Sequence, residues 1–176
     1  MAPSEPIAIG TDVTGAIALV QGGSAATTAR WLARLGVRSS MIAAVGRDAT
    51  GRALVKTMES DRVAMRAVRI PGARTGRIGV VVSPGGERSF VTDRGAALRL
   101  GPADLKADWF AGTDLLHLTV YSLLGDPLAD SGLRAIELAL AVRADQQHGR
   151  VGEMSQEVAE QPERRTVGPV QVVDVE

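Results

Sequence analysis

Two adjacent glycines, Gly22 and Gly23, begin the stretch of sequence whose residue types are best suited to binding a ligand. Because glycine has no Cβ atom, backbone N–H groups and the start of a following helix can approach the hydroxyl groups of a ligand closely. Thr27 lies within about one helical turn of the glycines and adds a side-chain hydroxyl. The pattern predicts a site for a polar ligand, although two glycines taken alone more often form a tight turn between a strand and a helix.

Two later segments add a charged and an aromatic candidate. Arg94 follows a predicted hairpin and Tyr121 ends a predicted strand, and ligands of layered α/β proteins bind where the strands end. Each residue has a structural alternative, because Arg94 could be a solvated charge at a hairpin edge and Tyr121 a core side chain. The two histidines, His117 and His148, are far apart in the chain and there is no cysteine, so no metal site is predicted.

Strands and helices in alternation are expected to position these candidates. Small and apolar residues on one face predict a helix that Ser24 caps and Gly36 ends. Asp48 is placed to cap the next helix, and Asp126 and Pro127 to begin the last one. The expected strands are residues 17–20, 40–45 and 115–121, and further helices are expected over 49–59, over 102–110 and from 127 onward. Such alternation is typical of a layered α/β domain with a largely parallel sheet.

One element interrupts this alternation. Two β-rich runs, residues 77–83 and 88–92, flank a turn with the sequence Pro-Gly-Gly-Glu, which predicts a β-hairpin. Irregular insertions of this kind often carry function. The last helix has a regular apolar stripe, and we expect its members to be buried: Ala129, Leu133, Ile136 and Leu140.

The spacing of the glycines resembles the first signature of ribokinase-like (PfkB-family) sugar kinases. From Gly22 and Gly23 the chain runs through small residues to Gly36 and then to Gly46, at the intervals of that pattern. Every element of the pattern is present except an Asn, whose place is taken by Thr27. Residues 75–96 resemble the β-lid strands of the family and their exit, and residues 114–118 resemble its next core strand. The resemblance covers residues 6–145, the N-terminal half of such a kinase.

The resemblance implies a fold and a site. The fold would be a three-layer α/β/α ribokinase-like (Rossmann-like) sandwich, incomplete, with a β-hairpin lid over about residues 75–96. The substrate-binding residues would be Gly22, Gly23, Thr27, Arg94 and Tyr121. A Thr hydroxyl offers one donor and a shorter reach than the amide of Asn, so we expect weakened sugar affinity.

The resemblance also implies ATP-dependent transfer of phosphate to a sugar hydroxyl, with Mg²⁺. The family's opening strand, with an Asp that holds the sugar, is expected before residue 6. Its nucleotide site, its Gly-Ala-Gly-Asp anion hole and its base are expected after residue 145. Residues 12–16 echo that second motif only superficially, because Ile17 replaces a required glycine. We therefore assign no catalytic residue and no ATP or Mg²⁺ site, and expect a kinase part that is inactive alone; the alternatives are a sugar-binding module and a degenerate fragment.

Bulk properties restrict the partners. The formal net charge is zero and the pI about 6.8, so nothing suggests binding to nucleic acid or to an anionic membrane surface. No run of residues approaches the length of an apolar membrane span. The absence of cysteine favours a reducing compartment, and we expect a cytoplasmic protein. The expected partners are a small-molecule sugar and a second copy of the chain, bound through the lid hairpin.

The composition changes near Asp145. Residues 146–176 contain no Leu, Ile, Phe, Trp or Tyr, and six acidic residues against three basic ones. Such a segment offers little apolar area to offset its conformational entropy, so we expect a mostly disordered or non-family tail. A weak strand is expected over residues 170–175. The predicted organisation is a family domain over residues 6–145 followed by this tail.

Overall fold

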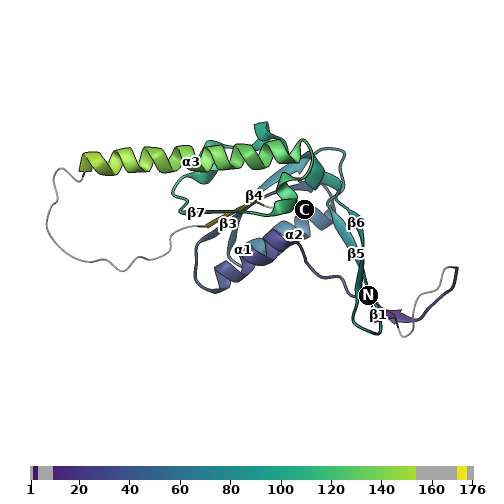
Figure 1. Cartoon of the computed structure of the whole chain (residues 1–176). Helices are drawn as coiled ribbons and strands as arrows, with labels where there is room; N and C mark the ends of the chain where they lie inside the picture. The colour runs from purple at the N-terminus through teal and green to yellow at the C-terminus, as the bar shows by residue number, and fades with distance from the viewer. Residues whose placement is uncertain (1, 4–9, 154–169, 174–176) are drawn as a thin grey trace.

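The computed structural model describes residues 2–3, 10–153 and 170–173, and its centre is a parallel four-stranded sheet (Figure 1). The strands lie in the order β4-β3-β8-β7. Their bounds are β3 (Ser39–Gly46), β4 (Val63–Ile70), β7 (Leu115–Leu118) and β8 (Val170–Val173). The predicted parallel sheet is confirmed.

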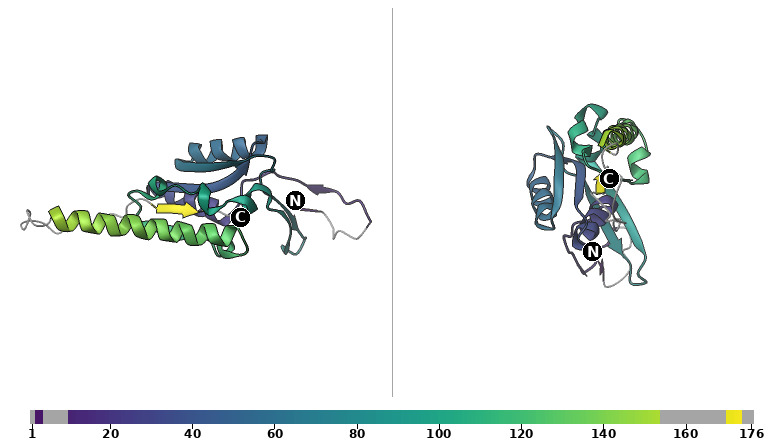
Figure 2. Two further views of the ribbon diagram at one scale, coloured as in Figure 1. Left: turned by 90° about the horizontal axis from the view of Figure 1, so that it is seen from above. Right: turned by 90° about the vertical axis from the view of Figure 1, so that its left-hand side faces the viewer.

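Helices cover both faces of the sheet. α1 (Ser24–Arg34) and α2 (Ala49–Ser60) pack on one face, and α3 (Leu128–Glu153) packs on the other (Figures 1 and 2). The predicted three-layer α/β/α sandwich is therefore confirmed. Within the described residues, no helix is long and apolar enough to cross a membrane.

Strand β3 joins two hydrophobic cores, because successive side chains of a strand point to opposite faces. Met41 and Ala43 pack toward α1 and α2, whereas Ile42 and Ala44 pack toward α3. The first core consists of Ala25, Ala26, Ala29, Ala33, Met41, Ala43, Met58 and Val63. The second consists of Ile42, Ala44, Leu100, Leu105, Phe110, Leu128, Ala135 and Leu138. The alternation in β3 thus supplies side chains to both cores.

The predicted hairpin is confirmed as β5 (Arg77–Val82) and β6 (Arg88–Asp93), which pair antiparallel and project from the sandwich (Figure 1). The small pair β1 (Ala2–Pro3) and β2 (Gly15–Ala16) lies next to β5. The described residues also form four short 3₁₀ helices: η1 (Gly95–Arg99), η2 (Pro102–Asp104), η3 (Ala107–Phe110) and η4 (Val120–Leu123). We refer to β5, β6 and their turn as the lid.

Several element predictions were wrong in detail. Residues 17–20 form no strand, and Leu19 is fully exposed, because an apolar run needs a neighbouring strand to pair with and no strand of the described residues pairs with it. Ser24 is the first residue of α1, and Gly23 occupies the N-cap position. The helix expected over residues 102–110 is two separate turns, η2 and η3, and the strand expected over residues 115–121 ends at Leu118. β4 was not predicted at all.

The buried face of α3 also differs from the prediction. Leu133 and Leu140 are exposed, whereas Leu128, Ala135 and Leu138 are buried. The Ser131 hydroxyl of this face donates to the carbonyl of Leu100 at 2.7 Å and so ties α3 to the end of η1. The helix has two apolar stripes, so periodicity alone could not decide which one faces the core.

The expected boundary near Asp145 falls inside a helix, because α3 continues to Glu153. The weak strand expected near the C-terminal end is present as β8, and it lies inside the sheet between β3 and β7. The other residues of the expected tail, 154–169 and 174–176, lie outside the described residues.

Candidate functional site

The candidate residues lie at the edge of the sheet where the parallel strands end. α1 leads through a short connection into β3 and packs along it, so the start of α1 lies near the C-terminal end of β3. Gly46 ends β3 at this edge and η4 follows the end of β7. In open α/β sheets, ligands bind outside the carboxyl ends of the strands.

The two glycines at the start of α1 have different roles. Gly23 has φ 100 and ψ 132, a conformation that residues with a side chain rarely adopt, so its identity is dictated by the backbone. Gly22 has no such constraint, and a Cβ atom added to it would meet nothing within 4 Å. The open space at Gly22 is what close approach of a ligand would require.

Thr27 is exposed on the first turn of α1, and its backbone N–H donates to the carbonyl of Gly23 at 3.0 Å. The hydroxyl of its neighbour Thr28 already donates a hydrogen bond to the carbonyl of Ser24 at 3.0 Å. Of the two threonines, Thr27 is the more exposed one.

Arg94 and Tyr121 lie together. The guanidinium carbon of Arg94 is 5.6 Å from the centre of the Tyr121 ring, within the range of a cation–π contact. Arg94 is half-buried, and Tyr121 is 48% exposed in η4. In the described part of the chain, no hydrogen bond or ion pair joins these two residues to Gly22, Gly23 or Thr27.

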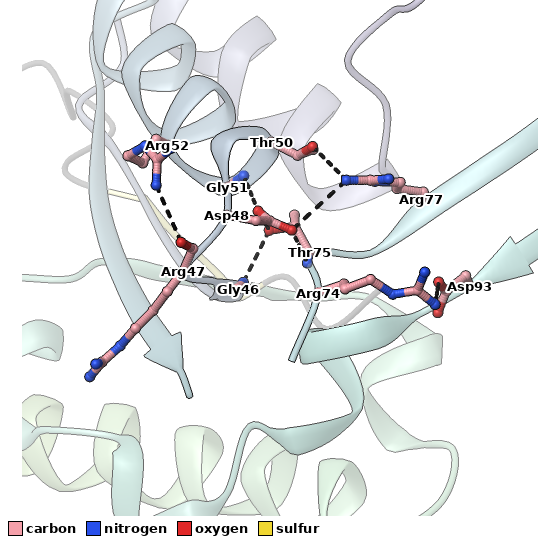
Figure 3. Close-up of polar contacts among 10 residues, drawn as sticks. All are labelled: Gly46, Arg47, Asp48, Thr50, Gly51, Arg52, Arg74, Thr75, Arg77 and Asp93. Carbon is pink, nitrogen blue, oxygen red and sulfur yellow. Dashed lines mark hydrogen bonds and ion pairs between the residues drawn. The ribbon is translucent and has the colours of Figure 1, made fainter. Parts of the chain in front are cut away.

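A polar cluster fastens the root of the lid to the sandwich (Figure 3). The carboxylate of Asp48 accepts hydrogen bonds from the backbone N–H of Gly51 at 2.8 Å and of Thr75 at 2.9 Å, and from the Thr75 hydroxyl at 2.6 Å. The Thr75 hydroxyl in turn accepts from the backbone N–H of Gly46 at 3.0 Å. One carboxylate thus joins the end of β3, the start of α2 and the segment that enters the lid.

Arginines extend this cluster into the lid. Arg77, the first residue of β5, donates to the Thr50 hydroxyl at 2.9 Å and lies 3.9 Å from the Asp48 carboxylate. Arg74 forms an ion pair with Asp93 at 3.0 Å, and the carbonyl of Arg74 accepts from the N–H of Ala96 at 2.7 Å. Both strands of the lid are therefore tied at their root.

Hydrogen bonding to the charged form lowers the pKa of Asp48 to about 2 from its ordinary 3.8. The largest cause is the bond from the Thr75 hydroxyl, followed by the backbone bonds from Thr75 and Gly51. Attraction to Arg77 adds to the effect, and burial opposes it. Asp48 is therefore ionised at neutral pH and acts as an acceptor.

Gly46 and Gly51 are required by this close packing. A Cβ atom at Gly46 would lie 2.4 Å from the carbonyl oxygen of Ala73, and one at Gly51 would lie 2.6 Å from the Thr75 hydroxyl. We predict that Gly46→Ala lowers the free energy of unfolding by about 1–3 kcal/mol, measured by urea denaturation. Gly85→Ala in the lid turn is the matched control, because its Cβ would meet nothing closer than 3.9 Å, and an equal loss in both variants would contradict the prediction.

Residues 11–160 match the sequence profile of the pfkB family carbohydrate kinases. The chain belongs to this family. It is 31% identical over 121 residues to a fructokinase-2 of Solanum habrochaites, a match that covers 67% of this chain and 37% of the relative. The chain therefore spans less than half the length of the curated relatives that it matches.

Two solved structures support the pfkB fold. The adenosine kinase of Sinorhizobium meliloti superposes with a TM-score of 0.66 at 28% identity, over 74% of this chain and 40% of that one. A fructokinase of Xylella fastidiosa with bound ATP superposes with a TM-score of 0.65 at 23% identity, over 81% and 45%. Kinases of the pfkB family use ATP.

The described residues contain no group of three or more His, Cys, Asp or Glu side chains that could hold a metal ion. Near the lid root the carboxylates of Asp48 and Asp93 are already engaged by Thr75, Gly51 and Arg74. We therefore assign no phosphate-transfer step to these residues.

Sequence reasoning identified Asp48 only as a helix cap, which the structure confirms. It missed the second role of Asp48, the contact with Thr75, because a hydrogen bond between residues 27 positions apart leaves no local pattern. A signal was present in the spacing of Gly46, Asp48 and Gly51, since glycines on both sides of a short polar side chain indicate close backbone contact.

Proposed function

We propose that this chain is the sugar-binding part of an ATP-dependent sugar kinase and that it transfers no phosphate by itself. The proposal rests on the open space around Gly22, just before α1, in a chain of the pfkB family. Because Gly22 has no Cβ atom, a ligand can approach its backbone there. The substrate class is a small sugar, as the fructokinase relatives suggest.

In this proposal, the backbone at Gly22 and Gly23 and the hydroxyl of Thr27 bind sugar hydroxyls. Arg94, which follows the lid, supplies hydrogen-bond donors, and Tyr121, which follows β7, supplies an aromatic face. Their mutual contact supports a shared role, because the ring holds the guanidinium in place without occupying its N–H groups.

The proposal of inactivity rests on what transfer requires. The γ-phosphate must be positioned, and its developing charge stabilised by metal ions and preorganised donors. In the family these groups, with Mg²⁺ and ATP, belong to a second half of the domain. The matched region spans 37% of the Solanum relative.

Gly22→Ala tests the sugar site without disturbing the fold. A methyl group there has free space in the unliganded protein, so we expect an unchanged melting temperature. The same methyl would block the ligand, and we predict about tenfold weaker sugar binding, the loss expected for one hydrogen bond. Isothermal titration calorimetry with fructose, ribose and adenosine measures this effect. If the variant and the parent protein bind sugar with equal affinity, Gly22 does not contact the sugar and the prediction is wrong.

We further propose that the lid contacts a second copy of the chain. Its apolar side chains are exposed, with Phe90 at 59% and Val91 at 76%, and an isolated two-stranded hairpin is at best marginally stable in water. We predict a dimer by light scattering and a monomer for Phe90→Lys. A monomeric parent protein would contradict this prediction.

A further inference from the structure

The segment that leads into α1 has an unusual burial pattern. Ile17, Leu19 and Val20 are large and apolar, yet they are between 79% and 100% exposed. Gln21, which follows them, is polar and only partly exposed. A buried polar group is more informative than an exposed apolar one, because its burial costs free energy unless it is hydrogen-bonded. Gln21 is therefore the residue of this segment whose position needs an explanation.

The side-chain amide oxygen of Gln21 lacks a hydrogen-bond donor. This atom, Oε1, is buried, and it accepts no hydrogen bond from the described residues. The large majority of buried side-chain polar atoms in folded proteins have a partner, so each unpaired atom requires a specific cause. A bound ligand with a hydroxyl group would supply the missing donor.

The position of Gln21 distinguishes it from the other unpaired oxygens of the described residues, which are the hydroxyls of Ser39 and Ser40. Both serines begin β3, at the end of the strand opposite Gly46. At the rise of an extended strand, Ser39 is about 23 Å from Gly46. Gln21 instead adjoins Gly22, with Cα atoms about 3.8 Å apart. Since the space around Gly22 is open, Gln21 is the one of the three that lies beside the candidate sugar site.

We propose that Oε1 of Gln21 accepts a hydrogen bond from a hydroxyl group of the bound sugar, and that Gln21 thereby selects sugars that carry this hydroxyl. The inference rests on the proposed function and adds a specificity-determining residue to the same site. An amide oxygen accepts hydrogen bonds and a sugar hydroxyl donates them, so the two groups are complementary. A buried acceptor also discriminates strongly, because an analogue without the hydroxyl leaves the acceptor unpaired.

Gln21→Met tests the inference first in the absence of sugar. Methionine is flexible and unbranched, and it fills the place of the glutamine side chain without an amide that must be paired. Because Oε1 has no partner to lose, we expect the melting temperature of the unliganded variant to equal or exceed that of the parent protein. A lower melting temperature would show that the amide is paired within the protein and would overturn the proposal.

Calorimetric titration with fructose, ribose and adenosine then measures binding. We expect Gln21→Met to bind the sugar that the parent protein binds about tenfold more weakly, the loss expected for one hydrogen bond. Gln21→Glu keeps an acceptor oxygen in either protonation state, so it should bind more tightly than Gln21→Met. The matched control is Ser39→Ala, which removes another buried, unpaired oxygen and should leave the affinity unchanged. Circular dichroism checks that each variant is folded.

Monodeoxy analogues of the bound sugar, such as 2-deoxyribose for ribose, identify the hydroxyl. We expect one analogue to bind the parent protein about tenfold more weakly than the sugar, and to bind Gln21→Met as tightly as the sugar does. The proposal is wrong, although the sugar site stands, if Gln21→Met keeps the affinity of the parent protein or if Gln21→Glu binds no better than Gln21→Met. Equal discrimination by the parent protein and Gln21→Met against every analogue would also overturn it. If the parent protein binds no sugar, the proposed function fails and this inference fails with it.

Discussion

Asp48→Ala is expected to destabilise the protein by about 2–4 kcal/mol, because the substitution removes a helix cap and a charged acceptor of three hydrogen bonds. It also leaves the hydroxyl of Thr75, a residue that is only 3% exposed, without its acceptor. Urea denaturation followed by circular dichroism measures the loss. Asp130→Ala on the exposed side of α3 is the control and should change stability by less than about 0.5 kcal/mol.

The charge on Asp48 gives this prediction a pH signature. Its pKa in the folded protein is about 2, below the ordinary value of 3.8, so ionised Asp48 stabilises the fold. This contribution is complete well above pH 3.8 and is lost as the pH falls toward 2. Asp48→Asn keeps the shape of the side chain but cannot ionise, so its stability should fall less over that interval. Parallel pH profiles of the parent protein and Asp48→Asn would refute the assigned role.

The parts of the fold that sequence could predict are those encoded by neighbouring residues. The hairpin followed from β-rich runs around the turn at Gly85 and Gly86, and the start of α2 from the cap at Asp48. Both depend on contacts within a few positions along the chain. The family spacing of the glycines likewise gave the correct three-layer fold.

Long-range contacts account for what sequence missed. The buried stripe of α3 packs against Leu100, Leu105 and Phe110, which lie far away in the sequence, and residues 17–20 have the composition of a strand although no described strand pairs with them. Of the candidate site residues, the structure joins Arg94 to Tyr121. The sugar-binding roles of all five candidates, Gly22, Gly23, Thr27, Arg94 and Tyr121, are proposals. No sequence pattern near Thr75 predicted the polar cluster at the root of the lid.

The second large effect concerns catalysis, where we predict no turnover above background by the chain alone. In general, loss of one anion-hole donor costs a factor of about 10²–10³ in rate, and loss of a general base about 10²–10⁴ more. Thr27→Asn should not rescue transfer, because one restored hydrogen bond improves sugar affinity by only about 2- to 150-fold. The assay couples ADP release to NADH oxidation with ATP, Mg²⁺ and a panel of pentoses, hexoses, keto-deoxy sugar acids and nucleosides. Turnover by either protein would show that the remaining part of the kinase domain is not required.

Calorimetric titration of the same panel into the parent protein and Thr27→Asn tests most directly whether this chain holds the sugar site. We predict that at least one sugar binds to the parent protein and binds more tightly to Thr27→Asn, because the amide of Asn adds donors that the Thr hydroxyl lacks. Absence of binding heat for both proteins across the panel, with both shown to be folded by circular dichroism, would contradict the account.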